Sequence, residues 1–519
     1  MERCQQRLLL VMPPQLGLLS GFAAGLLSLA NFVRACMPEV RTDILDLSAH
    51  SLDAAKQQLV RSVGSHQVQR LFVGITTTTA SYQSALQMAQ LVRDMVPRAI
   101  IVLGGHHASA DPEIVLRSHP DIVDVIVIGE GEHPLCELLR HYPSLESVFG
   151  IAYLDDNSHF TRTGASKPLT QDELDSIPIT YGDKGLIGTP GKFDHATYVS
   201  ARGCPLRCAF CAVGNDDIRA KSIPAVIRNI ETLLGMGFSR IAIEDNFFAH
   251  SPSRTREICE ALSDIRHRWH DAFAWDCQTR VESLARRDTI ELMAKAGCEA
   301  VYIGVESVHP KQLIYLNKTA NPREYLETLT EVVAPALLNT SIRCYLNLQF
   351  GLPGEAEDHE RATCAVLAAL GRLAVSRGKH ITVFPQLHVV YPGTTHFKQG
   401  VAQRCFPEDV FEAFTRWEFS QTPVLYWLGE HFAHGTGGIP VGILKPHVLK
   451  SGNFEGDVDD VVDTNAVFRI SAALREIDRI QGVHTFGYGD YIVANTNSAK
   501  ATAICKAGAR TPSKKGAVR

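Results

Sequence analysis

Three closely spaced cysteines are the residues of this sequence best suited to chemistry. Cys204, Cys208 and Cys211 stand four and three residues apart, so their thiolates can converge on one soft metal centre. A structural zinc site normally has a fourth cysteine or histidine ligand, and the nearest candidate here, His195, lies on the far side of an expected strand. The spacing therefore favours a soft metal centre with one open coordination position. A zinc site is the alternative.

Small and hydroxyl-bearing residues follow three successive apolar runs nearer the N-terminus. Four threonines occupy 76–79, Gly-Gly-His-His-Ala-Ser occupies 104–109, and Gly-Glu-Gly-Glu occupies 129–132. If the runs are neighbouring parallel strands, these segments meet at one sheet edge, where small residues let a bulky ligand approach the backbone. An ordinary tight turn explains any one of the segments alone. Together they predict a ligand site at that edge.

Alternating apolar and helical stretches must position these segments. The periodicity predicts a doubly wound parallel α/β sheet whose ligand lies beyond the carboxyl ends of its strands. The expected strands are 7–12, 40–45, 71–75, 99–103 and 125–128, and the expected helices are 21–35, 52–63, 82–95, 112–118 and 134–140.

A second alternating series begins at residue 197 and carries the cysteines just after its first strand. Six strand–helix units predict a (βα)6 partial barrel, whose reactive groups gather at the carboxyl ends of the strands. The expected strands are 197–201, 240–244, 272–277, 300–305, 341–350 and 381–391, and the expected helices are 222–236, 253–268, 288–296, 322–338 and 357–375.

Length and composition agree with such an arrangement. At roughly 100 to 200 residues per domain, 519 residues predict two to four domains. The net charge of −5 gives no support for a nucleic-acid partner. Thirteen cysteines, an odd number, of which ten are scattered, favour a reducing cytoplasm over a secreted disulfide scaffold. Pro13 and Pro14 interrupt the apolar N-terminal stretch, so neither a membrane span nor a signal peptide is expected there.

The same patterns suggest five parts. We expect the first sheet in 1–142, a proline-bearing linker in 143–196, the partial barrel in 197–395, a C-terminal α/β extension that caps the barrel or holds the substrate in 396–500, and a basic, disordered tail in 501–519.

The cysteine segment resembles the signature of the radical SAM superfamily. Cys204-x-x-x-Cys208-x-x-Cys211 has an aromatic residue, Phe210, before its last cysteine and follows the first barrel strand. The resemblance implies that the three thiolates hold a [4Fe–4S] cluster. It also implies that S-adenosylmethionine (SAM) chelates the open iron through its amino and carboxylate groups.

Later strand ends match the same family in order. Taken singly, each could be a paired carboxylate or a turn, whereas their order after the cysteines implies SAM contacts. The implied SAM-binding residues are Phe210; Glu244 and Asp245 for the amino group; Arg280 for the carboxylate; Glu306 and Ser307, followed by Asn317-Lys318, for the ribose; and Gly351, Pro353 and Gly354, near the adenine.

The first 395 residues resemble the cobalamin-binding branch of that superfamily, with its class B methyltransferases. One departure concerns the Asp-x-His-x-x-Gly motif whose histidine ligates cobalt, because the segment compared with it, Asp46 to Ser51, lacks that pattern. His106 or His107 could substitute, or the cobalt could have no protein ligand from below. The implied cobalamin contacts are Thr76, Thr77, Gly104, Gly105, His106, Gly129, Glu130 and Gly131.

The resemblance implies an enzyme that reductively cleaves SAM and methylates an unactivated carbon or phosphorus of a small natural-product intermediate. Its electron donor would be a flavodoxin or ferredoxin. His388 and Tyr391 are candidates for the substrate pocket. Two alternatives stay open. One is a radical cyclisation, rearrangement or aminocarboxypropyl transfer, and the other is a non-catalytic iron–sulfur or zinc module.

Overall fold

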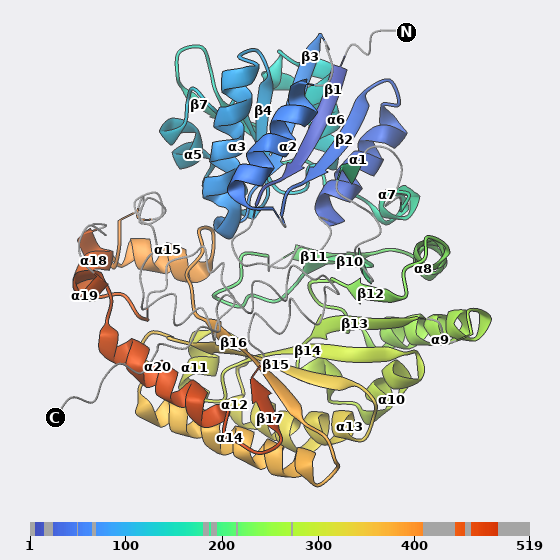
Figure 1. Ribbon diagram of the computed structural model, residues 1–519, viewed down its shortest axis with the longest axis vertical. Helices are drawn as coiled ribbons and strands as arrows, with labels where there is room; N and C mark the ends of the chain where they lie inside the picture. The colour runs from blue at the N-terminus through green and yellow to red at the C-terminus, as the bar shows by residue number, and fades with distance from the viewer. Residues whose placement is uncertain are drawn as a thin grey trace, which may run out of the picture.

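Two large sheets with a small hairpin between them make up the protein in the computed structural model (Figure 1). The first sheet and its helices lie above the second in the view of Figure 1. The described residues are 6–14, 24–48, 50–64, 69–179, 186–187, 195–213, 216–270, 273–407, 410, 442–451 and 458–485. The tail expected at 501–519 and much of the expected C-terminal extension lie outside them.

The core of the first sheet is five parallel strands in the order β5-β4-β3-β1-β2, as expected for a doubly wound domain. Continuous apolar runs form them because helices cover both faces; in β1, five successive residues are buried. The strands are β1 (Gln6–Met12), β2 (Arg41–Asp46), β3 (Arg70–Thr76), β4 (Ile100–Gly104) and β5 (Val125–Val127).

Helices connect these strands close to the predicted positions. Asp111 caps one of them, α5, by accepting a hydrogen bond from the backbone N–H of Ile114. The elements are α1 (Ala24–Cys36), α2 (Leu52–Gly64), η1 (Thr79–Ser81), α3 (Tyr82–Met95), α4 (His106–Ala110), α5 (Pro112–Ser118), α6 (Glu132–His141) and η2 (Leu145–Ser147).

The segment expected as a linker, 143–196, contributes three further strands to this sheet. β6 (Ile151–Leu154) pairs antiparallel with β5, and β7 (Phe160–Arg162) pairs antiparallel with β6. On the opposite edge, β8 (Leu186–Ile187) pairs in parallel with β2. Between them lies α7 (Gln171–Ser176). We therefore propose that the first unit extends to Ile187.

The second sheet contains the six parallel strands of the expected partial barrel, in the order β16-β15-β14-β13-β12-β9. Its strands are β9 (His195–Tyr198), β12 (Arg240–Ile243), β13 (Ala274–Thr279), β14 (Cys298–Glu306), β15 (Arg343–Phe350) and β16 (Ile381–Leu387), and β17 (Val483–Thr485) pairs with β16 at one edge. The predicted fold class, a doubly wound domain followed by a partial barrel, is confirmed.

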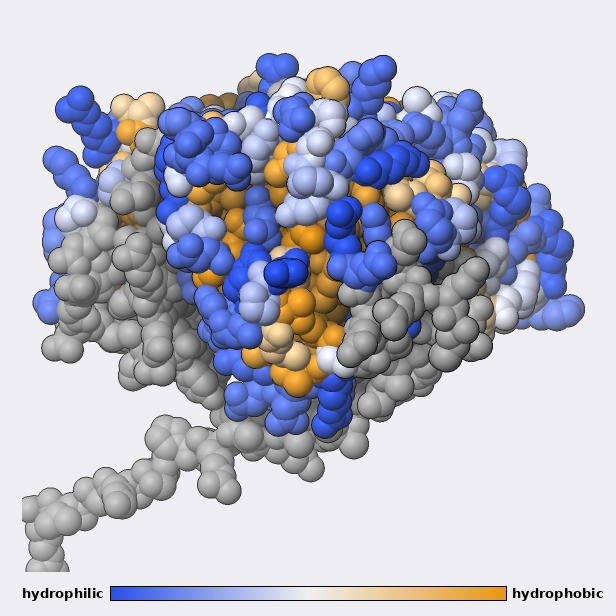
Figure 2. Space-filling model, turned by 90° about the horizontal axis from the view of Figure 1, so that it is seen from above, coloured by the Kyte–Doolittle hydropathy of each residue, from blue (hydrophilic) through white to orange (hydrophobic). Residues whose placement is uncertain are grey.

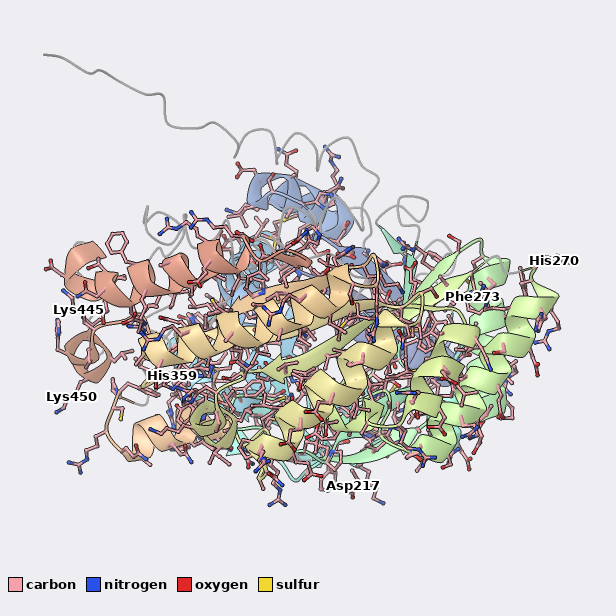
Figure 3. The ribbon with its side chains drawn as sticks, turned by 90° about the horizontal axis from the view of Figure 1, so that it is seen from below. Asp217, His270, Phe273, His359, Lys445 and Lys450 are labelled. Atoms are coloured by element: carbon pink, nitrogen blue, oxygen red, sulfur yellow. The ribbon has the colours of Figure 1, made fainter. Side chains whose placement is uncertain are left out.

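Helices on the outer side of this sheet follow the predicted alternation. α14 and α20 lie side by side there (Figure 3), joined by an ion pair of 2.6 Å between Arg469 and Glu360. The elements are α8 (Ile223–Gly235), α9 (Pro252–Arg268), η3 (Glu282–Leu284), α10 (Arg287–Lys295), α11 (Pro310–Tyr315), α12 (Pro322–Glu327), η4 (Thr328–Val333), α13 (Ala334–Leu338), α14 (Glu357–Val375), α15 (Thr395–Ala402), α18 (Pro446–Ser451), α19 (Val458–Val461) and α20 (Thr464–Ile477).

The face of the first unit that is seen from above is mainly polar (Figure 2). Seen from above, hydrophilic side chains cover most of this face, and a narrower apolar strip shows near its middle (Figure 2). Within the described ranges, no helix has both the length and the apolar character that crossing a membrane requires.

Candidate functional site

The three clustered cysteines lie at the end of the first strand of a two-stranded hairpin and in the segment that joins its two strands, between the large sheets. β10 (Ala201–Cys204) pairs antiparallel with β11 (Asp216–Ala220), and the pairing is irregular between Arg202 and Cys204. Gly203 has a φ of +86°, and a Cβ there would overlap the backbone of Asp217. This position therefore requires glycine, and its conformation fixes how Cys204 leaves the hairpin.

The rest of the cysteine loop is tied to the barrel. The N–H of Ala209 donates to the carbonyl of Leu316 at 2.9 Å, and the N–H of His396 donates to the carbonyl of Ala209 at 3.0 Å. The side-chain amide of Asn317 donates to the carbonyl of Arg207 at 2.6 Å. The loop is thus held from two sides before any metal binds.

The thiols of this loop suit an iron–sulfur cluster. Cys204, Cys208 and Cys211 are each partly exposed, whereas most other described cysteines are buried. Arg280 donates from Nη1 to Sγ of Cys208 at 3.2 Å. Burial raises the pKa of the Cys204 thiol above its ordinary value, so metal binding there would displace a proton. Three sulfur donors on one restrained loop match the ligand set that such a cluster needs.

Two adjacent carboxylates at the end of β12 have different surroundings. Asp245 is 1% exposed and accepts hydrogen bonds from the N–H and hydroxyl of Ser200, both at 2.6 Å, and from the N–H of Ala201 at 2.9 Å. Burial raises its pKa to about 6. Glu244 instead lines the large cavity described below. Of the two, Glu244 is the carboxylate that can meet a ligand, and Asp245 joins β12 to the start of the hairpin.

A buried network lies at the ends of β14, β15 and β16. Glu306, with a φ of +69°, pairs with Lys318 at 3.3 Å and accepts a hydrogen bond from Nε2 of Gln349 at 2.7 Å. The amide oxygen of Gln349 then accepts from Nδ1 of His388 at 2.7 Å. This orientation places the proton of His388 on Nδ1 and leaves Nε2 without a partner among the described residues.

The two residues expected in a substrate pocket, His388 and Tyr391, do not line the large cavity described below. His388 is 1% exposed, and burial, with a smaller contribution from His396, lowers its pKa to about 3. Burial raises the pKa of Tyr391 to about 12. Neither residue is among the described lining of the large cavity, although Pro392 and Gly393 are. In this structure His388 supports Glu306 through Gln349.

The remaining expected SAM contacts lie at these strand ends. Gly351 and Gly354 have φ values of +74° and +73°, and their loop closes on Glu355, which accepts the N–H of Gly351 at 2.5 Å. Burial raises the pKa of Glu355 to about 7. The carbonyl of Pro353 accepts a hydrogen bond from Gln312 at 3.2 Å, and Ser307 accepts the N–H of His309 at 3.1 Å. Phe210 is half-buried in the cysteine loop.

A cavity of about 1440 Å³ separates the edges of the two sheets. One wall consists of strand-end loops from the first sheet, and the opposite wall consists of 197–203 with Glu244 and Asn246. Residues 162–168 of the segment after β6 add a third side. The predicted cobalamin contacts that line the cavity are Thr76, Thr77, Gly105, His106, Gly129, Glu130 and Gly131, whereas Gly104 does not line it; the predicted SAM contact Glu244 also lines it.

The first-sheet wall is shaped by backbone rather than by charge. Gly105 has a φ of +92°, and a Cβ there would lie 2.5 Å from the carbonyl oxygen of Thr77. The hydroxyl of Thr77 donates to the carbonyl of Gly104 at 2.8 Å and accepts the N–H of Ala108 at 3.1 Å, so it joins two loops. Gly129 has a φ of +76° and no atom near the position of a Cβ. A flat ligand can therefore approach this wall closely.

The structure distinguishes between the two histidines, His106 and His107, that could replace the missing cobalt ligand. The segment Asp46 to Ser51 begins at the last residue of β2, and its described residues do not line the cavity; Asp46 instead accepts the N–H and hydroxyl of Ser48. His106 is the one histidine among the described lining residues, and burial lowers its pKa. His107 is buried against Tyr82, with ring centroids 4.1 Å apart. His106 is thus the better placed of the two expected substitutes.

A second group of possible metal ligands lies at the start of α14. Side-chain atoms of His309, Asp358 and His359 lie within 4.8 Å of one another, and Figure 3 labels His359. Nδ1 of His359 already accepts the N–H of Ala356 at 3.1 Å, as a helix-capping group does. We therefore interpret His359 as a capping residue of α14 rather than as a metal ligand.

Comparison with known families fits this geometry. The model of the B12 binding domain matches residues 19–139, and the model of the radical SAM superfamily matches residues 198–362. The chain is a B12-binding radical SAM protein. Its cofactors are accordingly a [4Fe–4S] cluster, SAM and cobalamin.

Relatives of this radical SAM protein cover it to different extents. It is 26% identical to an uncharacterized methyltransferase of Pyrococcus horikoshii over 76% of this chain and 83% of the relative. It is 30% identical to the anaerobic magnesium-protoporphyrin IX monomethyl ester cyclase of Cereibacter sphaeroides over 54% of this chain, but spans only 47% of that relative.

A solved structure supports the fold of the radical SAM protein. The methyltransferase TsrM of Kitasatospora setae, with cobalamin and a [4Fe–4S] cluster bound, aligns with a TM-score of 0.64 and 15% identity over 78% of this chain and 76% of TsrM.

Sequence reasoning missed several residues of the cavity. Arg202, Arg219 and Lys221 line it, as do Met12 and 24–29. A signal for Arg202 was available, because it stands two residues before the first clustered cysteine. Arg219 gave no local signal, since the pairing of β11 with β10 brings it to the site.

Proposed function

We propose that this protein is a cobalamin-dependent methyltransferase that acts on an unactivated carbon or phosphorus of a small natural-product intermediate. One observation carries the proposal. A single cavity has the glycine-rich edge of the B12-binding sheet on one side and, on the other, the segment that leads into the cysteine loop, with Glu244 beside it. Cofactors held on the two walls can act on one substrate between them.

Each of the three cofactors implied for this protein supplies a different part of the chemistry. When bound, the cluster supplies an electron, SAM supplies a radical precursor and a methyl group, and cobalamin carries that methyl group. The protein holds these groups in position and keeps water away from them. The following assignments concern the residues of this chain.

The three cysteines hold the cluster in this proposal, and Arg280 lies against one of the thiols. We assign Glu244 to the SAM ammonium, because it is the free carboxylate of the β12 end. We assign Arg280 to the SAM carboxylate, since its guanidinium already lies 3.2 Å from Sγ of Cys208, beside the cluster position.

The ribose and adenine positions follow from the other strand ends. Glu306 is held by Lys318 and Gln349, so its carboxylate is preoriented before SAM arrives. The backbone of 351–354 turns through two glycines and offers groups to an adenine. His388 stays neutral in this arrangement, which keeps an additional positive charge away from Glu306.

The first-sheet wall would hold cobalamin by shape. Thr77 and Gly105 bring two strand-end loops together, and Gly129 leaves open space for a corrin. His106 is the candidate for the side of the ring that faces the sheet, because it is the histidine of that wall. A reduced flavodoxin or ferredoxin is the proposed electron donor, and its presence would place the protein in the cytoplasm.

Anaerobic reconstitution tests the proposal. Protein produced with added cobalamin should show the absorbance of both an iron–sulfur cluster and a corrin. With SAM and a reductant it should form 5'-deoxyadenosine. Incubation with methyl-labelled SAM and a metabolite extract should then give a product heavier by one labelled methyl group.

Other outcomes would change the assignment. A fully loaded cluster that does not cleave SAM would reject every radical mechanism. A product without the label would instead support ring closure, the reaction named for the cyclase of Cereibacter sphaeroides that resembles this chain.

A further inference from the structure

Four charged side chains connect the first sheet to the hairpin that leads into the cysteine loop. Arg202 lies on β10 and Arg219 on β11, while Glu130 lies in the loop after β5 and Glu132 at the first position of α6. Arg202 pairs with Glu132 at 2.6 Å, and Arg219 pairs with Glu130 at 2.5 Å. We call these four residues the inter-sheet clasp.

Glu130 has its carboxylate fully engaged within the clasp. Arg219 donates to its two oxygens at 2.5 and 3.0 Å, which is the bidentate geometry that guanidinium favours. The N–H of Leu169 donates to Glu130 at 3.1 Å, and Arg219 donates to the carbonyl of Leu169 at 3.0 Å. Arg202 adds a contact of 3.5 Å. Glu130 therefore acts toward the hairpin, although it was expected to contact cobalamin.

Glu132 forms the more buried half of the clasp. Its side chain is 3% exposed and accepts hydrogen bonds from Arg202 at 2.6 Å and from the hydroxyl of Ser28 at 2.7 Å. Arg202 also donates to the hydroxyl of Ser28 at 2.8 Å. A carboxylate buried to this degree is costly without its cation, so the pairing with Arg202 is strongly favoured.

The hairpin alone would place two like charges together. Arg202 and Arg219 are direct cross-strand partners in the β10–β11 pair, an arrangement that repels when both are charged. Burial by itself would lower the pKa of Arg202, but Glu132 and Glu130 reverse this and raise it. Burial would likewise raise the pKa of Glu130, and Arg219 and Arg202 bring it below its ordinary value. The first sheet thus supplies the carboxylates that pair with both arginines.

The clasp also stands next to both cofactor walls. Arg202 is separated from Cys204 only by Gly203, whose positive φ and irregular pairing fix the backbone there. Glu130 stands between Gly129 and Gly131, which line the cavity on the first-sheet side. A shift of either partner would consequently move a cluster ligand relative to the B12-binding edge.

We propose that the inter-sheet clasp sets the distance between the bound cobalamin and the cluster, so that Arg202, Arg219, Glu130 and Glu132 are positioning residues for the reaction. This inference rests on the proposed function. It adds that the two cofactors are held at one spacing by ion pairs between the sheets, rather than by the packing of the loops alone.

Pulsed electron paramagnetic resonance on the full-length protein tests the inference. The probes are the unpaired spins of cob(II)alamin and of the reduced cluster, and the readout is the width of the distance distribution between them. We expect a narrow distribution in the unmodified protein and one about twofold broader in Arg219→Gln and in Glu130→Gln, because each change removes the bidentate pair between these two side chains. The double variant should be no broader than either single variant, as expected for two residues that act as one pair.

Two further variants control for general damage. Arg93→Gln removes an ion pair of similar length and exposure, 2.7 Å to Asp124, that lies inside the first unit away from the hairpin. It should leave the distribution unchanged. Arg219→Lys keeps the charge but loses the bidentate fork, so an intermediate width is expected. Absorbance titration of cobalamin shows whether each variant still carries the cofactor, and Arg93→Gln, which lies outside the cavity lining, should bind it within about twofold of the unmodified protein.

The possible failures are distinguishable. If the unmodified protein binds no cobalamin or holds no cluster, no dipolar signal appears in any variant, and the proposed function itself fails. If the unmodified protein gives a narrow distribution and Arg219→Gln and Glu130→Gln match Arg93→Gln, the clasp does not set the spacing and the inference is overturned.

Discussion

The two walls of the cavity solve the problem of ligand binding by different means. On the first-sheet wall, Gly105 and Gly129 provide positive-φ backbone, and Thr77 uses its hydroxyl to join loops. On the opposite wall, the ionisable side chains Glu244, Lys221 and Arg202 line the cavity, and Arg202 is paired with a buried carboxylate. Shape dominates the first wall and charge dominates the second.

Because of this difference, different kinds of substitution should impair ligand binding at each wall. A backbone wall is sensitive to any added atom, because the close approach of its loops depends on missing side chains. A charged wall is sensitive to the loss of a partner, since a buried charge without its counter-ion costs far more than the pair itself. Substitutions can therefore separate the two modes.

The largest expected effect is at the cysteine loop. Cys208→Ser replaces a cluster ligand, so 5'-deoxyadenosine formation from SAM should fall by about a thousandfold or more, to background. Anaerobic assay with quantified iron measures this. Cys405→Ser, which changes an exposed cysteine outside the loop, should retain both iron and SAM cleavage. Full cleavage by Cys208→Ser would contradict the cluster assignment.

The first-sheet wall should respond most to an added methyl group. Gly105→Ala puts a Cβ 2.5 Å from the carbonyl of Thr77 at a φ of +92°, and should weaken cobalamin binding by about tenfold to a hundredfold, since such strain costs roughly 1–3 kcal/mol. Absorbance titration gives the affinity. Gly64→Ala, where a Cβ meets no atom within 4 Å and which lies outside the cavity lining, should bind normally. Equal affinities for the two variants would mean that shape does not govern this wall.

A smaller effect is expected from one charge on the barrel side. Glu244→Gln removes the carboxylate assigned to the SAM ammonium and should weaken SAM binding by about tenfold, the value of one charged hydrogen bond. Calorimetry on protein with an intact cluster would measure it. Asp245→Asn is the informative comparison, because Asp245 faces Ser200 and Ala201 and its loss should instead lower stability. Weakened SAM binding in Asp245→Asn alone would reverse the assignment of the pair.

The smallest expected effect is a pH dependence of the free energy of unfolding that comes from Glu355, on the barrel side. The pKa of Glu355 is raised to about 7 by burial, so the folded state holds its proton at pH values where the unfolded chain has released it. The free energy of unfolding should therefore decrease as pH rises from the ordinary carboxyl range to about 7, by roughly 1–3 kcal/mol.

Urea denaturation at about pH 5 and about pH 8 measures this decrease. Glu355→Gln mimics the protonated acid and should remove that part of the decrease, whereas Glu357→Gln, on the exposed start of α14, should not. A pH dependence unchanged in Glu355→Gln would show that Glu355 ionises freely in the folded protein.

Hydrophobic periodicity was enough to predict the parallel cores of both sheets. Buried parallel strands are nearly continuous apolar runs, which makes segments such as 71–75 and 341–350 recognisable. The antiparallel strands β6 and β7 escaped notice because they are short, partly exposed and separated by polar residues. Their existence depends on the edge of β5, which local sequence does not reveal.

The site was predictable by segment but not by side chain. The sequence pointed to the end of β12, yet only the fold distinguishes Glu244, which faces the cavity, from Asp245, which is enclosed by Ser200 and Ala201. Glu130 was expected to face a ligand and instead pairs with Arg219, 89 residues away. Contacts of this kind form only when two separately folded sheets meet.

The pairing of β8 with β2 has a practical consequence for producing the first unit on its own. Because β8 completes the far edge of the first sheet after β6 and β7 have completed the other, a fragment that stops at residue 142 would leave both borders of that sheet without their outer strands. Exposed borders of this kind invite aggregation. A dissected B12-binding module should therefore be expressed at least through Ile187, just before the polypeptide enters the barrel.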